Sequence, residues 1–235
     1  LLGLGGSDTD ISDDKTPLAG GMLTTDHIAY VQGVGNGKFL PYGPMTRAAA
    51  AQMLYNLLTD SSREMYYSTS STFSDVSSGS WYSAAVSTLA NADVINGYPD
   101  GSFKPDRAIS RAEFIKLIVA MFGVDESATA SYTDLKTSNW AYPYIATATS
   151  NGWITGYTDG SCKPTNSIQR GEAVTFMNRV LVRTCDTSYV AAHLSSLNTF
   201  TDVKTNLWCY AAVMEAANGH NYSTSTGSEV WTSLK

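Results

Sequence analysis

Three arginines in this 235-residue chain could bind an anion, because each stands where a helix is expected to begin: Arg47, Arg111 and Arg170. Ser110 and Glu113 have the spacing of a capping box, which places Arg111 at the first helical position. A cation there is disfavoured by about 0.3–1 kcal/mol, since it faces the positive end of the helix dipole. A guanidinium beside free backbone N–H groups can nevertheless hold a carboxylate or phosphate. The recurrence therefore favours a ligand-binding role.

A structural role is the alternative for these arginines. Each could pair with one of the recurring aspartates, Asp75, Asp134 and Asp202, and so tie neighbouring units together. The aspartates themselves are expected to cap helices rather than to contact a ligand.

Tryptophans and glycines recur in the same parts of the chain. Trp81, Trp140 and Trp208 stand where other helices are expected to open. An exposed indole can stack on a sugar and donate its N–H, but each tryptophan could equally anchor its helix in the core. Gly97 and Gly156 would allow close approach of a ligand, and helix C-caps explain them at least as well.

All of these residues belong to an internal repeat with an offset of 59 residues. The recurring set in the first copy is Asp75, Trp81, Gly97, Tyr98, Asp100, Gly101, Lys104, Pro105, Ile109, Arg111 and Glu113, and in the second copy Asp134, Trp140, Gly156, Tyr157, Asp159, Gly160, Lys163, Pro164, Ile168, Arg170 and Glu172. Each copy must be one supersecondary unit packed on its neighbours. Apolar spacing of three and four before and after a turn-rich connector predicts helix, loop, helix.

The same pattern occurs in halves at the two ends of the chain. Gly33 through Arg47 match the connector and second helix, and Phe200 through Ala217 match the first helix. We expect these halves to pair and to close a ring of three units. The predicted bounds are a flexible linker at 1–26, repeats at 27–60, 73–124 and 132–182, and a terminal half-repeat at 200–222.

The combination Phe-x-Asp-Val, Trp, Gly-Tyr-x-Asp-Gly-x-x-x-Pro and Ile-Ser-Arg-Ala-Glu resembles the S-layer homology repeat. The resemblance covers about residues 27–222 and is strongest over 73–124. It implies an all-α fold, a pseudo-threefold bundle of three helix-loop-helix repeats. In that family, grooves between repeats bind secondary cell-wall polymers, often with a pyruvylated sugar whose carboxylate needs a cation. The arginines match the family's basic residue, and the three tryptophans match its groove aromatic.

This chain departs from the family pattern at several positions. Gln169 and Gly171 replace the Ser110 and Ala112 of the other copy, so that helix should be less well capped. The first half-copy has Val34, Asn36 and Ala49 in place of Tyr98, Asp100 and Glu113. We expect its groove to be the most altered.

Composition excludes several classes of function. A net charge of −6 without basic runs argues against nucleic acid. No apolar stretch reaches the roughly 20 residues of a membrane helix. Cys162, Cys185 and Cys209 have no metal-ligand spacing; a Cys185–Cys209 disulfide is possible, and Cys162 suits a small buried position.

The sequence thus predicts a monomeric, non-catalytic module of a larger exported protein of a Gram-positive bacterium, bound to cell-wall polysaccharide at the cell wall. A lattice or protein-interaction module, rich in tyrosine (14 residues), is the alternative. A glycoside hydrolase is disfavoured, because few of the six glutamates are available as a catalytic pair. No cofactor or metal is expected, since His27, His193 and His220 have no metal or triad spacing.

Overall fold

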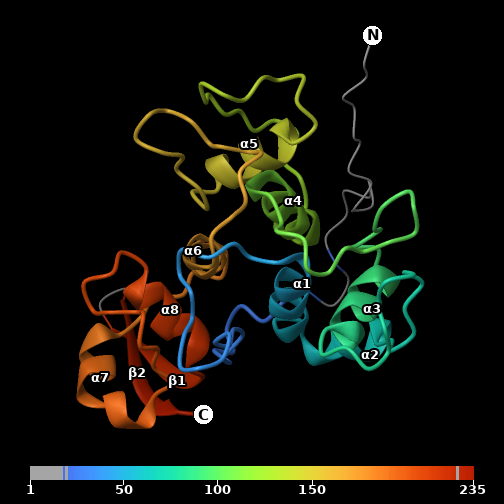
Figure 1. Ribbon diagram of the computed structural model, residues 1–235. Helices are drawn as coiled ribbons and strands as arrows, with labels where there is room; N and C mark the ends of the chain where they lie inside the picture. The colour runs from blue at the N-terminus through green and yellow to red at the C-terminus, as the bar shows by residue number, and fades with distance from the viewer. Residues whose placement is uncertain (1–17, 19–20, 226–227) are drawn as a thin grey trace. The chain divides into compact units, whose positions relative to one another are not determined.

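The computed structural model describes residue 18 and residues 21–225 and 228–235 of the chain (Figure 1). The described residues form two compact units: one contains residues 18, 21–22 and 46–166, and the other contains residues 23–45, 167–225 and 228–235. Its elements are α1 (Arg47–Asn56), α2 (Asp60–Tyr66), α3 (Ser83–Asn91), α4 (Arg111–Phe122), α5 (Tyr142–Ser150), α6 (Arg170–Val180), α7 (Thr187–Ala192), the 3-10 helix η1 (Leu194–Ser196), α8 (Tyr210–Ala217), β1 (His220–Ser225) and β2 (Ser228–Leu234).

In the first unit, α1 packs on α3 and α4 packs on α5. Helix α4 begins where the sequence predicts: the Ser110 hydroxyl accepts a hydrogen bond from the Glu113 backbone N–H at 3.1 Å, and the Glu113 carboxylate accepts one from the Ser110 N–H at 2.6 Å. Gly123, with φ of 96°, ends the helix. Phe114, Ile115 and Ile118 on the predicted apolar face are fully buried, whereas Phe122 at its end is half-buried.

Glu113 should stabilise the first unit in a pH-dependent way. Burial raises its pKa, but the Ser110 N–H and the Arg107 guanidinium, 2.7 Å away, outweigh burial and hold that pKa below its usual value. Because the folded-state pKa is the lower one, the stabilisation is complete above the ordinary carboxyl pKa and disappears as the pH falls through the folded-state pKa. Glu113→Gln should therefore cost about 1–2 kcal/mol at pH 7 and progressively less in acid.

Urea unfolding at several pH values measures this difference. Glu64→Gln is the matched control, since Glu64 is exposed on α2. A Glu113→Gln penalty that stayed constant down to pH 3 would contradict the assignment.

The first-half helices begin later than the sequence predicts. Helices α3 and α5 start two residues after Trp81 and Trp140, with Tyr82 and Ala141 as N-caps. The aspartates that were expected to cap them instead bind the connector, as described below. The tryptophans therefore lie in turns before the helices.

In the second unit, α6 packs on α8, and the N-terminal segment lies against both. The Tyr30 N–H donates to the Ala216 carbonyl at 2.9 Å, and the Tyr30 hydroxyl donates to Asn178 Oδ1 at 2.5 Å. The rings of Phe39 and Phe200 lie 5.3 Å apart. The two terminal half-copies therefore contact each other, while the complete pseudo-threefold arrangement stays a prediction.

The expectation of an all-α fold is wrong at the C-terminal end. Strands β1 and β2 form an antiparallel hairpin, which Figure 1 shows beside α7 and α8. Val190 of α7, Met214 of α8 and Trp231 of β2 share one buried cluster with Leu197. The region predicted as a terminal half-repeat therefore ends in a strand from His220 onward.

Three smaller expectations can be compared with the fold. Most of the predicted linker 1–26 lies outside the described residues, but Met22 is buried and forms a backbone bridge with Leu58. All three cysteines are free, so the Cys185–Cys209 disulfide that the sequence left open is not formed, and Cys162 is buried as expected. Among the described helices, none has both the length and the apolar character that a membrane crossing requires.

Candidate functional site

Each recurring arginine occupies the first position of a helix and is anchored on a backbone carbonyl. Arg47, at the start of α1, donates from Nε to the Phe103 carbonyl at 2.7 Å. Its guanidinium carbon lies 4.6 Å from the centre of the Phe103 ring and 4.8 Å from that of Tyr98. Only 2% of Arg47 is exposed, so the connector fixes the guanidinium in one orientation.

The same arrangement occurs at the other two arginines. Arg111 Nε donates to the Cys162 carbonyl at 3.0 Å, with its guanidinium 4.8 Å above the Tyr157 ring. Arg170 Nε donates to the Phe39 carbonyl at 2.7 Å, and its Nη2 donates to the Gln32 carbonyl at 2.8 Å. Burial lowers the pKa of Arg170, while Asp202 raises it.

Each arginine thus contacts the connector of the following copy rather than its own. Arg47 binds connector 97–105, Arg111 binds connector 156–164, and Arg170 binds connector 33–41 near the N-terminus. One half-copy therefore contributes to two different sites: its helix carries the arginine of one, and its connector forms part of another. The sequence pattern alone does not show that an arginine and the connector it binds come from different copies.

The recurring aspartates bind backbone N–H groups of the same connectors. Asp75 accepts from the backbone N–H groups of Phe103 and Lys104, both at 2.7 Å. Asp134 accepts in the same way from residues 162 and 163, and Asp202 from residues 39 and 40. Burial raises the pKa of Asp134 and Asp202, but these amide hydrogen bonds outweigh it and lower both pKa values.

This arrangement corrects the expectation that the aspartates cap helices. Their two hydrogen bonds hold a residue with positive φ at the same place in each connector: 57° at Leu40, 56° at Lys104 and 49° at Lys163. Non-glycine residues rarely adopt this conformation, and the surrounding contacts must stabilise it. The carboxylates and arginines together keep each connector in one shape.

Tyrosines and lysines add to two of the three sites. Lys104 Nζ lies 4.0 Å from the centre of the Tyr98 ring, and Lys163 Nζ lies 4.1 Å from that of Tyr157. Arg107 also contacts the Tyr98 hydroxyl. Tyr98 and Tyr157 therefore hold cations beside Arg47 and Arg111, a role that their recurrence in the sequence does not reveal.

The Arg170 site lacks these additions. At an offset of 64, Val34 and Leu40 stand where the other connector has Tyr98 and Lys104. A hollow of about 610 Å³ adjoins this connector and is lined by Gln32, Gly33, Lys38, Asn198 and Phe200 among others. The altered groove expected from the first half-copy thus maps onto the Arg170 site, whereas its Ala49 belongs to the Arg47 site.

The tryptophans are exposed rather than buried in the core. The exposed fraction is 65% for Trp81, 41% for Trp140 and 53% for Trp208. A Cβ built on Gly171, the residue after Arg170, would lie 3.3 Å from Trp208 Cζ2. The indole of Trp208 therefore lies at the N-terminus of α6, where it could stack on a bound sugar.

The two predicted site glycines have a packing reason of their own. Gly97 has φ of 69°, and an added Cβ would lie 2.3 Å from the Phe73 ring. Gly156 has φ of 70°, and its Cβ would lie 2.5 Å from the Tyr132 ring. Helices α3 and α5 end at Asn91 and Ser150, so neither glycine is a C-cap.

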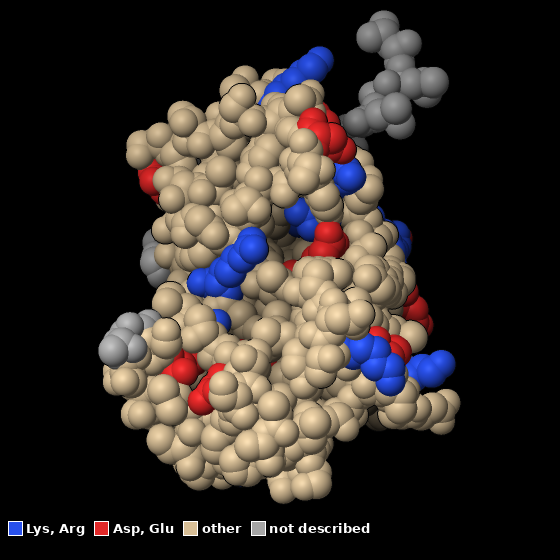
Figure 2. Space-filling view, turned by 90° about the vertical axis from the view of Figure 1, so that its left-hand side faces the viewer, with Lys and Arg blue, Asp and Glu red and all other residues tan. Residues whose placement is uncertain are grey.

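Charge is local rather than general on this protein. On the face drawn in Figure 2, basic and acidic side chains form small separate groups on a mostly uncharged surface. The charged residues make up 15% of the chain. Affinity for an anion must therefore come from individual sites such as those around the three arginines.

These features define a class of repeat protein in which a buried arginine at a helix N-terminus meets the next connector, and an exposed tryptophan precedes the first helix of each repeat. The S-layer homology domain model matches residues 72–115 and 131–174 of the chain. The chain belongs to the S-layer homology family.

Relatives of known name extend this similarity over most of the chain. It is 33% identical over 219 residues to a cellulosome-anchoring protein of Acetivibrio thermocellus, covering 91% of this chain and 47% of that protein. It is 33% identical over 214 residues to cell surface glycoprotein 1 of the same organism, covering 86% of this chain and 9% of that protein. A surface layer protein of Brevibacillus choshinensis is 34% identical over 101 residues, covering 41% of this chain and 9% of that protein. The chain thus spans less than half of each of these relatives.

Proposed function

We propose that this chain is a non-catalytic module that holds an exported protein on the bacterial cell wall. Its ligand is an anionic secondary cell-wall polysaccharide, and the group recognised is a carboxylate such as that of a pyruvyl ketal. Location at the cell surface agrees with the family and with relatives named as surface and anchoring proteins. The two terminal half-copies complete the third repeat of the module.

The observation that carries the proposal is the fixed position of the three arginines. Each Nε is held by a connector carbonyl, which orients the planar guanidinium at the N-terminus of its helix. A preoriented guanidinium loses little freedom when it binds a carboxylate through two parallel hydrogen bonds. An exposed indole nearby suits the apolar face of the sugar that carries the carboxylate.

Polysaccharide released from cell walls tests this function directly. The chain should bind the intact polymer, and removal of its pyruvyl ketals by mild acid should weaken binding about tenfold or more, since charge-assisted hydrogen bonds are lost. Arg111→Ala and Trp140→Ala should each reduce affinity for the intact polymer in isothermal titration calorimetry. Lys136→Ala, a change at an exposed cation, is the control.

The exposed Trp140 makes this test independent of folding. Loss of Arg111 removes a buried contact, so its variant must retain the wild-type circular dichroism spectrum. Equal affinity for intact and ketal-free polymer would contradict recognition of the carboxylate.

A lattice or protein-interaction module is the second candidate, favoured by large exposed apolar groups. Tyr42, Tyr67 and Trp81 are 60%, 58% and 65% exposed. If these residues join copies of the chain, light scattering should rise with protein concentration in the absence of glycan, and Tyr67→Ser should reduce it. If the chain stayed monomeric at all concentrations, the lattice function would be excluded and anchoring would remain.

A further inference from the structure

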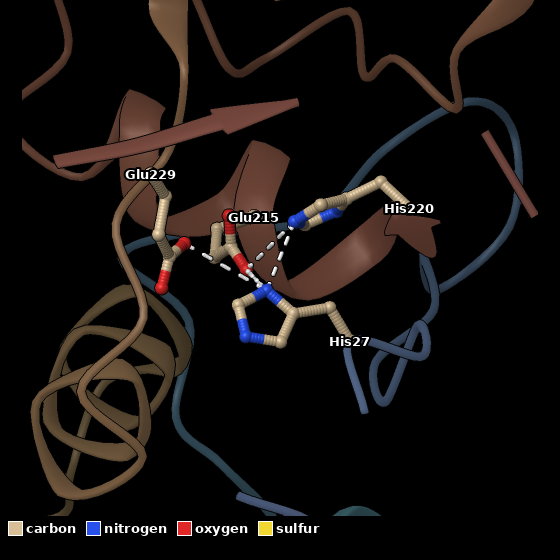
Figure 3. Close-up of side chains that lie close together, drawn as sticks. All are labelled: His27, Glu215, His220 and Glu229. Carbon is tan, nitrogen blue, oxygen red and sulfur yellow. Dashed lines mark hydrogen bonds and ion pairs between the residues drawn. The ribbon is translucent and has the colours of Figure 1, made fainter. Parts of the chain in front are cut away.

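Four titratable side chains converge inside the second unit, one from the N-terminal segment and three from residues 215–229 (Figure 3). His27 comes from the N-terminal segment, Glu215 from α8, His220 from β1 and Glu229 from β2. One ligand atom from each lies within 4.8 Å of the other three. Figure 3 shows their polar ends pointing toward one another.

The spacing of these atoms suits a tetrahedral metal ion. His27 Nδ1 lies 3.0 Å from His220 Nε2, 3.2 Å from Glu215 Oε1 and 3.7 Å from Glu229 Oε2, and His220 Nε2 lies 3.6 Å from Glu215 Oε1. Zinc bonds of about 2.0–2.1 Å require neighbouring ligand atoms about 3.3–3.4 Å apart in a tetrahedron. The observed distances lie on both sides of this value, so small side-chain shifts would bring all four atoms to bonding distance.

Neighbouring groups orient the ligand atoms. The Asn218 carbonyl lies 2.9 Å from His220 Nδ1, and because a carbonyl can only accept, Nδ1 carries the proton and Nε2 offers its lone pair to the cluster. The His220 ring stacks on Trp231 with 3.7 Å between centroids, and the His27 ring stacks on Tyr222 at 4.1 Å. The His220 N–H also donates to the His27 carbonyl at 2.9 Å, which fixes the two backbones together.

The carboxylate of Glu215 is buried without a well-formed hydrogen bond; burial raises its pKa, and the Trp231 indole is near enough to oppose that rise. Glu215 is 1% exposed, and neither of its oxygens accepts a well-formed hydrogen bond. A carboxylate buried in this way is costly unless a cation neutralises it. The nearby Arg183 uses its guanidinium on the carbonyls of Leu23 and Asp26, at 3.0 and 2.9 Å.

In the free cluster His27 Nδ1 donates its proton to His220 Nε2, so metal binding would require His27 to carry that proton on Nε2 instead. Burial, with Arg183 next, lowers the pKa of His27 to about 4, and burial also lowers that of His220, so both rings are neutral at neutral pH. Burial raises the pKa of Glu215 to about 7 and also raises that of Glu229, so a divalent cation would have to displace the carboxyl proton before two carboxylates balance its charge. The positive charge of Arg183 opposes the cation and is the main unfavourable contribution nearby.

We propose that His27, Glu215, His220 and Glu229 form a structural site for a divalent transition-metal ion, with Zn²⁺ as the ion that fits best. Imidazole ligands favour zinc over magnesium or calcium, which take six or more oxygen ligands. Four protein ligands and deep burial are typical of a structural rather than a catalytic zinc site. The metal would fasten the N-terminal segment, which supplies Gln32 and Phe39 to the Arg170 site, to α8 and the hairpin.

Titration of the chelator-treated protein with Zn²⁺ tests the proposal. We expect one ion per chain by calorimetry, a rise in melting temperature on addition of Zn²⁺, and its reversal by EDTA. His27→Gln and Glu229→Gln should each weaken binding at least tenfold. His193→Gln and Glu64→Gln are matched controls, since both residues are exposed and outside the cluster, and these variants should bind as the wild type does.

Spectroscopy of the wild type keeps the test independent of variant folding. Bound Co²⁺ should show the intense visible absorption of tetrahedral coordination, and X-ray absorption of the zinc form should show only nitrogen and oxygen ligands. A sulfur ligand at about 2.3 Å would instead implicate the nearby Cys185 and overturn the assignment. Loss of Zn²⁺ binding in His193→Gln would also overturn the assignment. If Zn²⁺ caused no shift in melting temperature, the four side chains would form a metal-free hydrogen-bonded network instead.

Discussion

Replacing Gly97 by alanine should destabilise the first unit much more than replacing Gly101 by alanine. Both glycines lie in the same connector with positive φ, 69° and 77°. The Cβ added at Gly97 would lie 2.3 Å from the Phe73 ring and 2.8 Å from the Ser102 carbonyl oxygen, whereas the Cβ added at Gly101 would meet nothing within 4 Å. The pair therefore separates backbone strain from steric overlap.

The size of the effect follows from these two contributions. A left-handed conformation costs a non-glycine residue about 1–2 kcal/mol, and Gly101→Ala should show only this loss. Gly97→Ala adds overpacking of about 1–3 kcal/mol, because the Phe73 ring is itself buried against Phe103. Urea unfolding of the two variants and the wild type measures both values.

The same comparison decides what Gly97 does for function. If the glycine exists for close approach of a ligand, Gly97→Ala should lose no more stability than Gly101→Ala and should lose glycan binding. We expect the reverse order, with stability lost first. Gly156→Ala should repeat the result, since its Cβ would lie 2.5 Å from the Tyr132 ring. Equal stability of the Gly97 and Gly101 variants would contradict the packing role.

Much of the helical framework can be predicted from the sequence because its signals are local. The capping box at Ser110 and Glu113 and the apolar spacing after it specify α4, and the structure has the helix at the predicted start. Helix α6 also begins at its arginine, with the Glu172 carboxylate accepting from the Gln169 N–H at 2.9 Å. Such signals act within one helical turn and so do not depend on the rest of the fold.

The hairpin and the histidine cluster depend on contacts that the sequence does not reveal. Strand β1, His-Asn-Tyr-Ser-Thr-Ser, has no alternation of apolar and polar residues and so gives no strand signal. His27 and His220 are 193 residues apart, and only the pairing of the chain ends brings their rings together. The absence of metal-ligand spacing in the sequence therefore says little about this part of the protein.

The arginine sites are an intermediate case. Recurrence at Arg47, Arg111 and Arg170 identifies the residues, because a cation at a helix N-terminus needs a reason. Recurrence cannot show that each arginine binds the connector of the next copy. The sequence pattern would be identical if each arginine bound the connector of its own copy. Exposure of the tryptophans was likewise undecided in the sequence, because a tryptophan before a helix suits either the core or the surface.

Loss of two arginine sites should reduce retention on the cell wall far more than loss of one. A polymer with many identical groups can occupy several sites of one chain, so a second contact forms at a high effective concentration. We expect Arg111→Ala alone to shorten the residence time on purified sacculi about tenfold, and Arg47→Ala with Arg111→Ala to shorten it about a hundredfold or more. Affinity for a soluble pyruvylated monosaccharide should change much less steeply, because it occupies one site at a time.

The Arg170 site should contribute least to retention, because Val34 and Leu40 replace the tyrosine and lysine that hold cations at the other two sites. Arg170→Ala should therefore shorten residence less than Arg111→Ala. The exposed pair Trp81→Ala and Trp140→Ala provides a second double variant whose fold is not at risk. Surface plasmon resonance on immobilised sacculi, with wall peptide digested away, measures all of these rates. If Arg170→Ala released the chain fastest, the hollow beside Gln32 and Gly33, rather than the tyrosine-lined sites, would be the principal glycan site.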